Sequence, residues 1–274
     1  MPRAGLPNGI ELEYRTTGDP ADPVLLAVCG YTSQLITWRQ GYIDQLAAQG
    51  LYVVQFDNRD VGLSTKFDGR LVSPEAVLEA RLAGVTLPPV PYPLSDMAAD
   101  GIGLLDHLGV DRAHIVGNSM GGMIVQTMAI EHPGRIASVT WIMSRTGDPE
   151  VGQATPEARD ALLAAPSSER DDYVASSVSS LIWASRKYGD ADHLRQLAAE
   201  QYDRCFYPEG GSRQLAAIYA SGDRTAELVP GSKLLLLSDM GHDMPPPLWP
   251  VLAEAIGGHV RTTLATANIL TATH

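Results

Sequence analysis

The chain alternates short apolar runs with helical segments, and this alternation constrains its fold more than any other feature. The run at 24–29 is apolar throughout and is closed by Gly30, which is typical of a parallel strand buried on both faces, and the other runs are mainly apolar. Five runs are predicted as strands: residues 24–29, 51–56, 113–116, 137–143 and 233–237. Strands that alternate with helices predict an α/β fold with a doubly wound, mostly parallel sheet.

Local signals predict a hairpin and one helix. Asn8 and Gly9 precede an alternating segment, and this pair favours an N-terminal β-hairpin with a type I′ turn. Ser95 is a candidate N-cap for a helix that Gly109 is expected to end. The helix is expected to bury one apolar face, formed by Met97, Leu104, Leu105 and Leu108.

The length predicts one domain that spans residues 1–274. Two segments interrupt the alternation, a proline-rich stretch at 87–93 and a long helical, charge-rich stretch at about 149–220. Both are predicted to lie above the sheet, and the second is predicted to form a helical cap. The sequence shows no internal repeat that would indicate a second domain.

Composition excludes several function classes. The formal net charge of -12 leaves no basic surface for neutralising phosphates, so a nucleic-acid partner is not expected. Cys29 and Cys205 are predicted to be free thiols. We expect no membrane span and a cytoplasmic location, because no sufficiently long apolar stretch occurs. No spacing of ligand residues indicates a metal or another cofactor, and a homo-oligomer stays open.

The segment Gly117-Asn118-Ser119-Met120-Gly121 carries the clearest chemical signal. It lies between a predicted strand and a predicted helix, which is the context of a nucleophile elbow. Glycine is needed two positions before and after the serine, because side chains there would collide with the neighbouring strand and helix. The pattern predicts Ser119 as a nucleophile; the alternative is a turn that only joins the strand to the helix.

At this point the chain resembles the α/β-hydrolase family, and most closely bacterial serine esterases of the aclacinomycin methylesterase type. The loop at 56–64, Phe-Asp-Asn-Arg-Asp-Val-Gly-Leu-Ser, resembles the family's loop after its fourth strand. The resemblance covers roughly residues 9–145 and resumes near the C-terminal histidine. It implies an oxyanion hole formed by the backbone N–H groups of Tyr31 and Met120, whose side chains are expected to line the pocket.

The resemblance also places the general base. His242 follows the last predicted strand, in the chain order expected for this fold. The triad acid is harder to assign, since the segment at 221–231 is too short for the usual additional strand and crossover. We therefore predict that the penultimate strand and its acid loop are missing. Asp148 is the candidate acid, with a plain turn before proline as the alternative.

These features give two hypotheses. The first is a serine esterase that cleaves carboxylic esters through an acyl-enzyme on Ser119; serine at the elbow argues against dehalogenase or epoxide-hydrolase chemistry. The second is a catalytically impaired or inactive ligand-binding relative, motivated by the missing acid. The hypotheses differ in whether His242 reaches Ser119 within about 2.6–3.2 Å.

The predicted substrate is a small apolar ester, and the resemblance points to methyl esters. Aromatic residues in the predicted cap are candidates for lining an apolar pocket, although such spacings are also typical of simple helix packing. They are Trp183, Tyr188, Tyr202, Phe206 and Tyr207.

Overall fold

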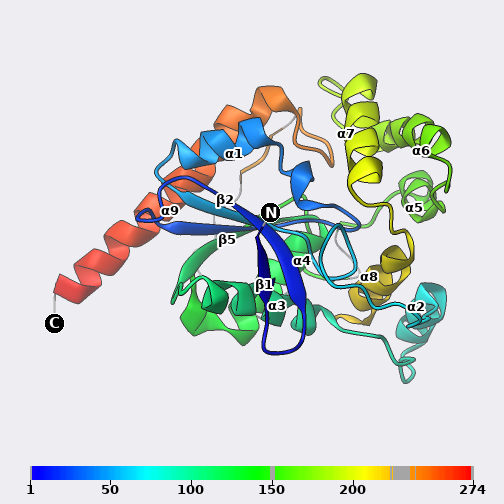
Figure 1. Ribbon diagram of the computed structural model, residues 1–274, viewed down its shortest axis with the longest axis horizontal. Helices are drawn as coiled ribbons and strands as arrows, with labels where there is room; N and C mark the ends of the chain where they lie inside the picture. Colours follow the sequence, from blue (N-terminus) through cyan, green and yellow to red (C-terminus); the bar gives the residue numbers. More distant parts are fainter. Residues whose placement is uncertain (1, 149–151, 223, 225–234, 238, 273–274) are drawn as a thin grey trace.

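The computed structural model describes residues 2–148, 152–222, 224, 235–237 and 239–272 (Figure 1). These residues form a sheet in the order β1-β2-β4-β3-β5-β6. The four strands from β4 to β6 in this order pair in parallel, whereas β2 pairs antiparallel with both β1 and β4. The strands are Arg3–Gly5 (β1), Glu11–Thr17 (β2), Val24–Val28 (β3), Tyr52–Phe56 (β4), Ala113–Asn118 (β5) and Ile136–Ile142 (β6). The predicted doubly wound, mostly parallel sheet is confirmed.

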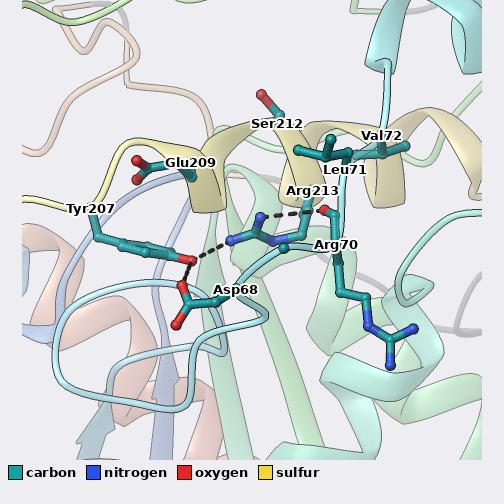
Figure 2. A pocket seen from close by; sticks show the side chains of 9 residues that line it. Asp68, Arg70, Leu71, Val72, Tyr207, Glu209, Ser212 and Arg213 are labelled. Atoms are coloured by element: carbon teal, nitrogen blue, oxygen red, sulfur yellow. Dashed lines mark hydrogen bonds between the residues drawn. The ribbon is translucent and has the colours of Figure 1, made fainter.

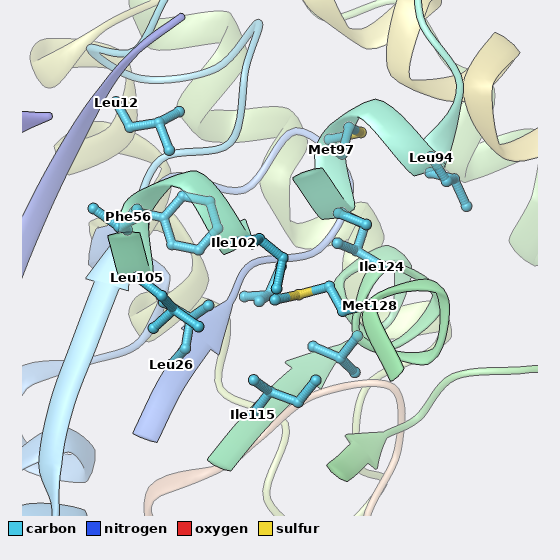
Figure 3. Packing of buried hydrophobic residues seen from close by; sticks show 14 of the residues in the cluster. Leu12, Leu26, Phe56, Leu94, Met97, Ile102, Leu105, Ile115, Ile124 and Met128 are labelled. Atoms are coloured by element: carbon cyan, nitrogen blue, oxygen red, sulfur yellow. The ribbon is translucent and has the colours of Figure 1, made fainter. Parts of the chain in front are cut away.

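The central strands are mainly apolar, and helices cover both faces of the sheet. Leu25 and Ala27 point to one core, shared with α1 (Gln40–Ala47) and α9 (Trp249–Ala272). Leu26 and Val28 point to the other core, shared with α3 (Leu94–His107) and α4 (Met120–Glu131). Figure 3 shows this second core, where side chains from α3 and α4 meet those of the strands. The alternation of side chains along β3 thus fills both layers.

Four of the five predicted strands are confirmed as β3, β4, β5 and β6, within a residue or two at each end. The fifth, at 233–237, is wrong over its described part, because Leu235–Leu237 form no strand. Leu235 and Leu236 are 52% and 80% exposed. A run of leucines indicates a buried strand only where a neighbouring strand is available to pair with it. The predicted absence of the penultimate strand falls largely on residues 225–234, which lie outside the described residues.

The N-terminal hairpin is confirmed, but its turn is not type I′. Gly9 has a positive φ of 83°, whereas Asn8 does not share the left-handed conformation that this turn requires. The Asn8 side chain instead accepts a hydrogen bond from the N–H of Ile10 (3.1 Å), and the N–H of Leu6 donates to the carbonyl of Ile10 (2.7 Å). The asparagine therefore stabilises a longer loop through its side chain.

The predicted N-cap of α3 is also wrong. Pro93 occupies the cap position, and Ser95 lies in the first turn, where its hydroxyl donates to the carboxylate of Glu131 on α4 (2.6 Å). This contact between two helices replaces the expected local cap. The end of the helix is as predicted: Gly109 adopts a φ of 69° directly after the C-cap residue Leu108.

The stretch between β6 and residue 221 is helical. Its helices are Pro156–Leu163 (α5), Arg170–Ser176 (α6), Ala191–Arg204 (α7) and Glu209–Ala220 (α8), with the 3-10 helix Ser177–Ile182 (η3). In Figure 1, α5, α6 and α7 lie together beyond one end of the sheet, and α8 lies between them and α2 (Pro74–Ala83). We name the described residues 152–220 the helical segment. Its role as a cap with bounds of about 149–220 stays a prediction.

Two buried ion pairs attach the helical segment to the loop after β4. Asp57 pairs with Arg204 at the end of α7 (2.7 Å), and Asp60 pairs with Arg213 on α8 (2.8 Å). Both carboxylates are fully buried. A third pair, Arg59 with Asp100, joins the same loop to α3 (2.7 Å). The loop that follows β4 therefore connects the sheet with the helical segment and with α3.

Candidate active site

Ser119 lies at a sharp turn between β5 and α4. Its φ of 52° and ψ of -120° are unusual for a residue with a side chain. A Cβ atom at Gly117 would lie 2.1 Å from the carbonyl oxygen of Gly121, and one at Gly121 would lie 2.2 Å from that of Val28. These distances are shorter than real contacts allow, so glycine is required at both positions. The predicted steric reason for the glycines is confirmed.

His242 contacts Ser119 directly. Its Nε2 atom lies 3.0 Å from the Oγ atom of Ser119, although 123 positions separate them in the chain. The serine is half-buried, and the histidine is open to solvent on one side. In this geometry Nε2 accepts the hydroxyl proton when the ring carries its other proton on Nδ1. The sequence-predicted base and nucleophile are thus brought within hydrogen-bonding distance.

The loop that carries His242 is attached to the helical segment. The backbone N–H of His242 donates to the carbonyl of Trp183 (2.6 Å). The Asp243 carboxylate accepts from the backbone N–H groups of Ser185 (2.9 Å) and Gly241 (3.2 Å). A Cβ at Gly241 would lie 2.3 Å from the backbone of Ala184, so the two chains are in close contact. The histidine therefore depends on residues 183–185 for its position.

The environment of His242 lowers the pKa of its imidazole below the ordinary value of 6.5. The main cause is burial among surrounding protein atoms, which disfavours the charged ring even though one side of the residue reaches solvent. The negative charge of Asp243 acts in the opposite direction and raises the pKa. Because burial is the larger effect, the ring is mostly neutral at pH 7, the state in which it can accept a proton.

Two backbone N–H groups lie next to the nucleophile. Met120 is the first residue of α4, and Tyr31 follows Gly30, where a Cβ would lie 3.3 Å from that of Ser119. Neither N–H donates a hydrogen bond within the described part of the chain. Both are therefore available to an oxygen atom at the serine. The phenol of Tyr31 stays protonated, since burial raises its pKa to about 12.

Asp148 is half-buried in the loop after β6, and its backbone N–H lies 3.4 Å from the hydroxyl of Thr146. Between described residues, the structure records no hydrogen bond from the imidazole of His242 to the Asp148 carboxylate. The β6 loop does reach the elbow through Ser144, whose hydroxyl donates to the carbonyl of Ser119 (2.7 Å). The assignment of Asp148 as the acid stays a prediction.

The aromatic residues of the helical segment have several roles. Tyr202 and Phe206 pack against Tyr173, with ring centroids 4.6–5.6 Å apart, which favours helix packing for this group. Tyr207 instead lines an open pocket between residues 68–72 and α8. Figure 2 shows its hydroxyl between Asp68 and Arg213, to which it makes hydrogen bonds of 2.6 and 2.7 Å. This pocket is lined by other residues than those around Ser119.

Sequence reasoning missed three polar residues that hold the loops of the site. Asp243 and Ser185 connect the histidine loop to the helical segment. Gln214 on α8 donates a hydrogen bond to the carbonyl of Arg59 and accepts one from the N–H of Thr32. The position of Asp243 next to His242 was a signal that could have marked it. Ser185 and Gln214 carry no such signal, because their partners lie far away in the chain.

Neither cysteine forms a disulfide, as predicted. Burial, and to a smaller extent Asp57, raises the pKa of Cys29 to about 12, so this thiol is not a nucleophile at neutral pH. Over the described ranges, no group of three or more His, Cys, Asp or Glu side chains could hold a metal ion. Within the same ranges, no helix has the length and apolar character needed to cross a membrane.

Comparisons with known proteins identify the family and the fold that this chain shares. The family model of the alpha/beta hydrolase fold matches residues 22–182. Rhodomycin D methylesterase DauP of Streptomyces sp. (strain C5) is 26% identical, over 89% of this chain and 93% of its own length. Two solved structures share the fold. The esterase EaEST of Exiguobacterium antarcticum has a TM-score of 0.68 and 13% identity, over 94% of this chain and 98% of its own. The enol-lactonase of Burkholderia xenovorans LB400 has a TM-score of 0.63 and 20% identity, over 96% of this chain and 100% of its own. The predicted resemblance to methylesterases of this type is confirmed.

Proposed function

The chain belongs to the α/β-hydrolase fold family, and we propose that it hydrolyses carboxylic esters through an acyl-enzyme on Ser119. The observation that carries the proposal is the 3.0 Å distance between His242 Nε2 and Ser119 Oγ at a strained strand-to-helix turn. The lowered pKa of His242 supports it, because a neutral imidazole is the form that acts as a base.

The reaction proceeds in two halves. Ser119 Oγ attacks the ester carbonyl carbon while its proton passes to His242 Nε2, and the carbonyl oxygen becomes an oxyanion. The backbone N–H groups of Tyr31 and Met120 stabilise this oxyanion, each contributing about 2.7–4 kcal/mol. His242 then donates its proton to the leaving alcohol, and the acyl group stays on Ser119. A water molecule attacks the acyl-enzyme while its proton passes to His242. His242 then returns this proton to Ser119 Oγ as the bond between the serine and the acyl group breaks, and the acid is released.

The proposed substrate class is an apolar ester with a small alcohol. The name of the relative DauP, a rhodomycin D methylesterase, supports a methyl ester, because that relative matches most of this chain. No cofactor enters the proposed mechanism, since the nucleophile, the base and the oxyanion donors all come from the protein.

Turnover of p-nitrophenyl butyrate by the purified protein tests the proposal. Ser119→Ala and His242→Ala should both reduce hydrolysis to near the uncatalysed rate. Ser138→Ala is a matched control, because Ser138 also contacts a histidine, with 2.7 Å between its hydroxyl and Nδ1 of His114. That pair lies at the other end of β5 and β6, so the control should keep full activity. Turnover that survives in Ser119→Ala would contradict the proposal.

The rival function, a catalytically impaired relative that binds ligands, is favoured by one observation. Within the described residues, no carboxylate is hydrogen-bonded to the imidazole of His242.

We propose Asp148 as the acid that the esterase would use. If Asp148 orients the imidazole, Asp148→Asn should reduce kcat by about 10⁴-fold, as loss of an orienting carboxylate does. If wild type and Asp148→Asn both stay at the background rate while folded, the impaired relative is the better description.

A further inference from the structure

The loop at residues 30–35 is held by a side chain from α8. Thr32 in this loop has a positive φ of 54°, which is strained for a β-branched residue. Its backbone N–H donates to Oε1 of Gln214 (2.9 Å). Gln214 is fully buried, and 182 positions separate the two residues in the chain. A contact from a distant helix thus stabilises an unfavourable backbone conformation directly after Tyr31.

The other end of the Gln214 amide is also bound. Its Nε2 donates to the backbone carbonyl of Arg59 in the loop after β4 (3.0 Å). The N–H of Thr32 requires an acceptor and the carbonyl of Arg59 requires a donor, so the two partners fix the orientation of the amide. Gln214 and Arg59 are both buried, so loss of the side chain leaves the Arg59 carbonyl without its donor, whereas Thr32 is exposed. Gln214 therefore joins the two loops that follow β3 and β4.

We infer that Gln214 is a positioning residue for the proposed reaction, which fixes the direction of the Tyr31 N–H towards the oxyanion. This inference rests on the proposed function, in which that N–H is one of two oxyanion donors. The N–H of Tyr31 lies on the peptide group before the one that Tyr31 shares with Thr32. Relaxation of Thr32 from its left-handed conformation therefore rotates the shared group and reaches this N–H through the backbone of Tyr31. A displacement of about 1 Å at a catalytic group is enough to reduce a rate about 10²-fold.

The far end of the 30–35 loop has its own anchors. Nε2 of Gln34 donates to the backbone carbonyls of Gln201 (2.8 Å) and Cys205 (2.9 Å), and its Oε1 accepts from Arg204 (2.7 Å). The loop therefore stays attached to α7 when Gln214 is changed. The effect of the change should be confined to the Tyr31–Thr32 part of the loop.

The test is Gln214→Met, which keeps the length of the side chain and removes both hydrogen bonds. Gln126→Met on α4 is the matched control: Gln126 is also buried, and it contacts Arg224 rather than the 30–35 loop. Two quantities are measured in wild type and both variants. The first is hydrogen exchange of the amides in residues 30–35, and the second is kcat and KM for p-nitrophenyl butyrate.

In Gln214→Met, the amide hydrogen of Thr32 should exchange at least about 10-fold faster than in the wild type. The kcat should fall about 10- to 100-fold, and KM should change less than about threefold. Gln126→Met should change neither quantity beyond about twofold. Unchanged exchange, or faster exchange with unchanged kcat, would overturn the inference. A wild type without Ser119-dependent turnover would instead refute the proposed function, and the exchange rates would still decide whether Gln214 holds the loop.

Discussion

Ser119 occupies a backbone conformation that only close packing can maintain. The N–H of Ser119 donates to the carbonyl of Ile142 at the end of β6 (3.0 Å), and its own carbonyl accepts from the hydroxyl of Ser144 (2.7 Å). Contacts from the end of β6 and from the loop after it thus hold both sides of the residue. Strained residues of this kind persist only where the surrounding structure determines them, and they are frequent at active sites.

Gly121→Ala should destabilise the protein, because its Cβ would meet the carbonyl oxygen of Val28 at 2.2 Å. We expect a loss of about 2–3 kcal/mol in the free energy of unfolding, together with loss of activity as the elbow shifts. Gly134→Ala is the control, since no atom lies within 4 Å of its Cβ position and its φ is not positive. Chemical denaturation measures both variants; equal stabilities would show that the elbow tolerates a side chain.

The activity of the wild type should fall on the acid side with an apparent pKa below 6.5, because burial lowers the pKa of His242 and only the neutral ring acts as a base.

Asp243→Asn removes the charge that raises the pKa of His242 and keeps an oxygen for the N–H groups of Ser185 and Gly241. The acid limb of kcat/KM should therefore move to lower pH. Asp239→Asn, which removes an exposed charge paired with Lys187, is the control. A limb that moves to higher pH would contradict this account.

At the scale of elements, the loop after β4 connects the sheet to the helical segment through charged groups. The Asp60 carboxylate accepts from Arg213 (2.8 and 2.9 Å) and from the hydroxyl of Tyr92 (2.6 Å). All three side chains are almost fully buried. A buried carboxylate without these partners would carry the full cost of leaving water, so the pair resists separation of α8 from the sheet.

Arg213→Met should lower the free energy of unfolding by about 3–5 kcal/mol, because it leaves the charge of Asp60 buried and uncompensated. The double variant Asp60→Asn with Arg213→Met removes both charges and should be more stable than the single variant. The exposed pair of Arg170 with Asp203 provides the comparison, and Arg170→Met should have a much smaller effect. A double-mutant cycle measured by urea denaturation checks this; a double variant as unstable as the sum of the singles would contradict it.

Elements with a strong local pattern could be predicted from the sequence, and elements that depend on distant partners could not. The composition of the runs was sufficient to predict β3 and β5, and steric reasoning was sufficient to predict the glycines around Ser119. The strand predicted from the leucines at 235–237 was wrong, because the same composition is compatible with a segment that pairs with no other strand. The prediction of Ser95 as an N-cap was wrong for a related reason, since its hydroxyl donates to Glu131 on another helix.

The proposed active centre lies where three parts of the chain meet. The sheet supplies Ser119, the C-terminal region supplies His242, and the helical segment holds both the histidine loop and the 30–35 loop. Ser119 and His242 were predictable because each carries a local motif. Gln214 was not, because its role arises only when α8 packs beside two other loops.

The stability of the whole molecule should fall as the pH drops from 6.5 to about 4. Burial lowers the pKa of His114 to about 4 and also lowers the pKa of His242, so the unfolded chain binds protons first in this range. Above pH 6.5 both states leave these rings neutral, and the effect vanishes. His114→Gln should make the slope shallower, whereas His107→Gln on an exposed surface should not. Urea denaturation at several pH values checks this, and an unchanged slope in His114→Gln would contradict it.

The central claim is that Ser119 is the nucleophile of this hydrolase, and stoichiometric trapping with a p-nitrophenyl alkylphosphonate tests it most directly. Attack by Ser119 Oγ on phosphorus should release one p-nitrophenolate per protein chain and leave the phosphonyl group on the serine. Mass spectrometry of peptides should then locate the added group on Ser119, and Ser119→Ala should release no burst. A burst that persists in Ser119→Ala, or a label on another residue, would contradict the account.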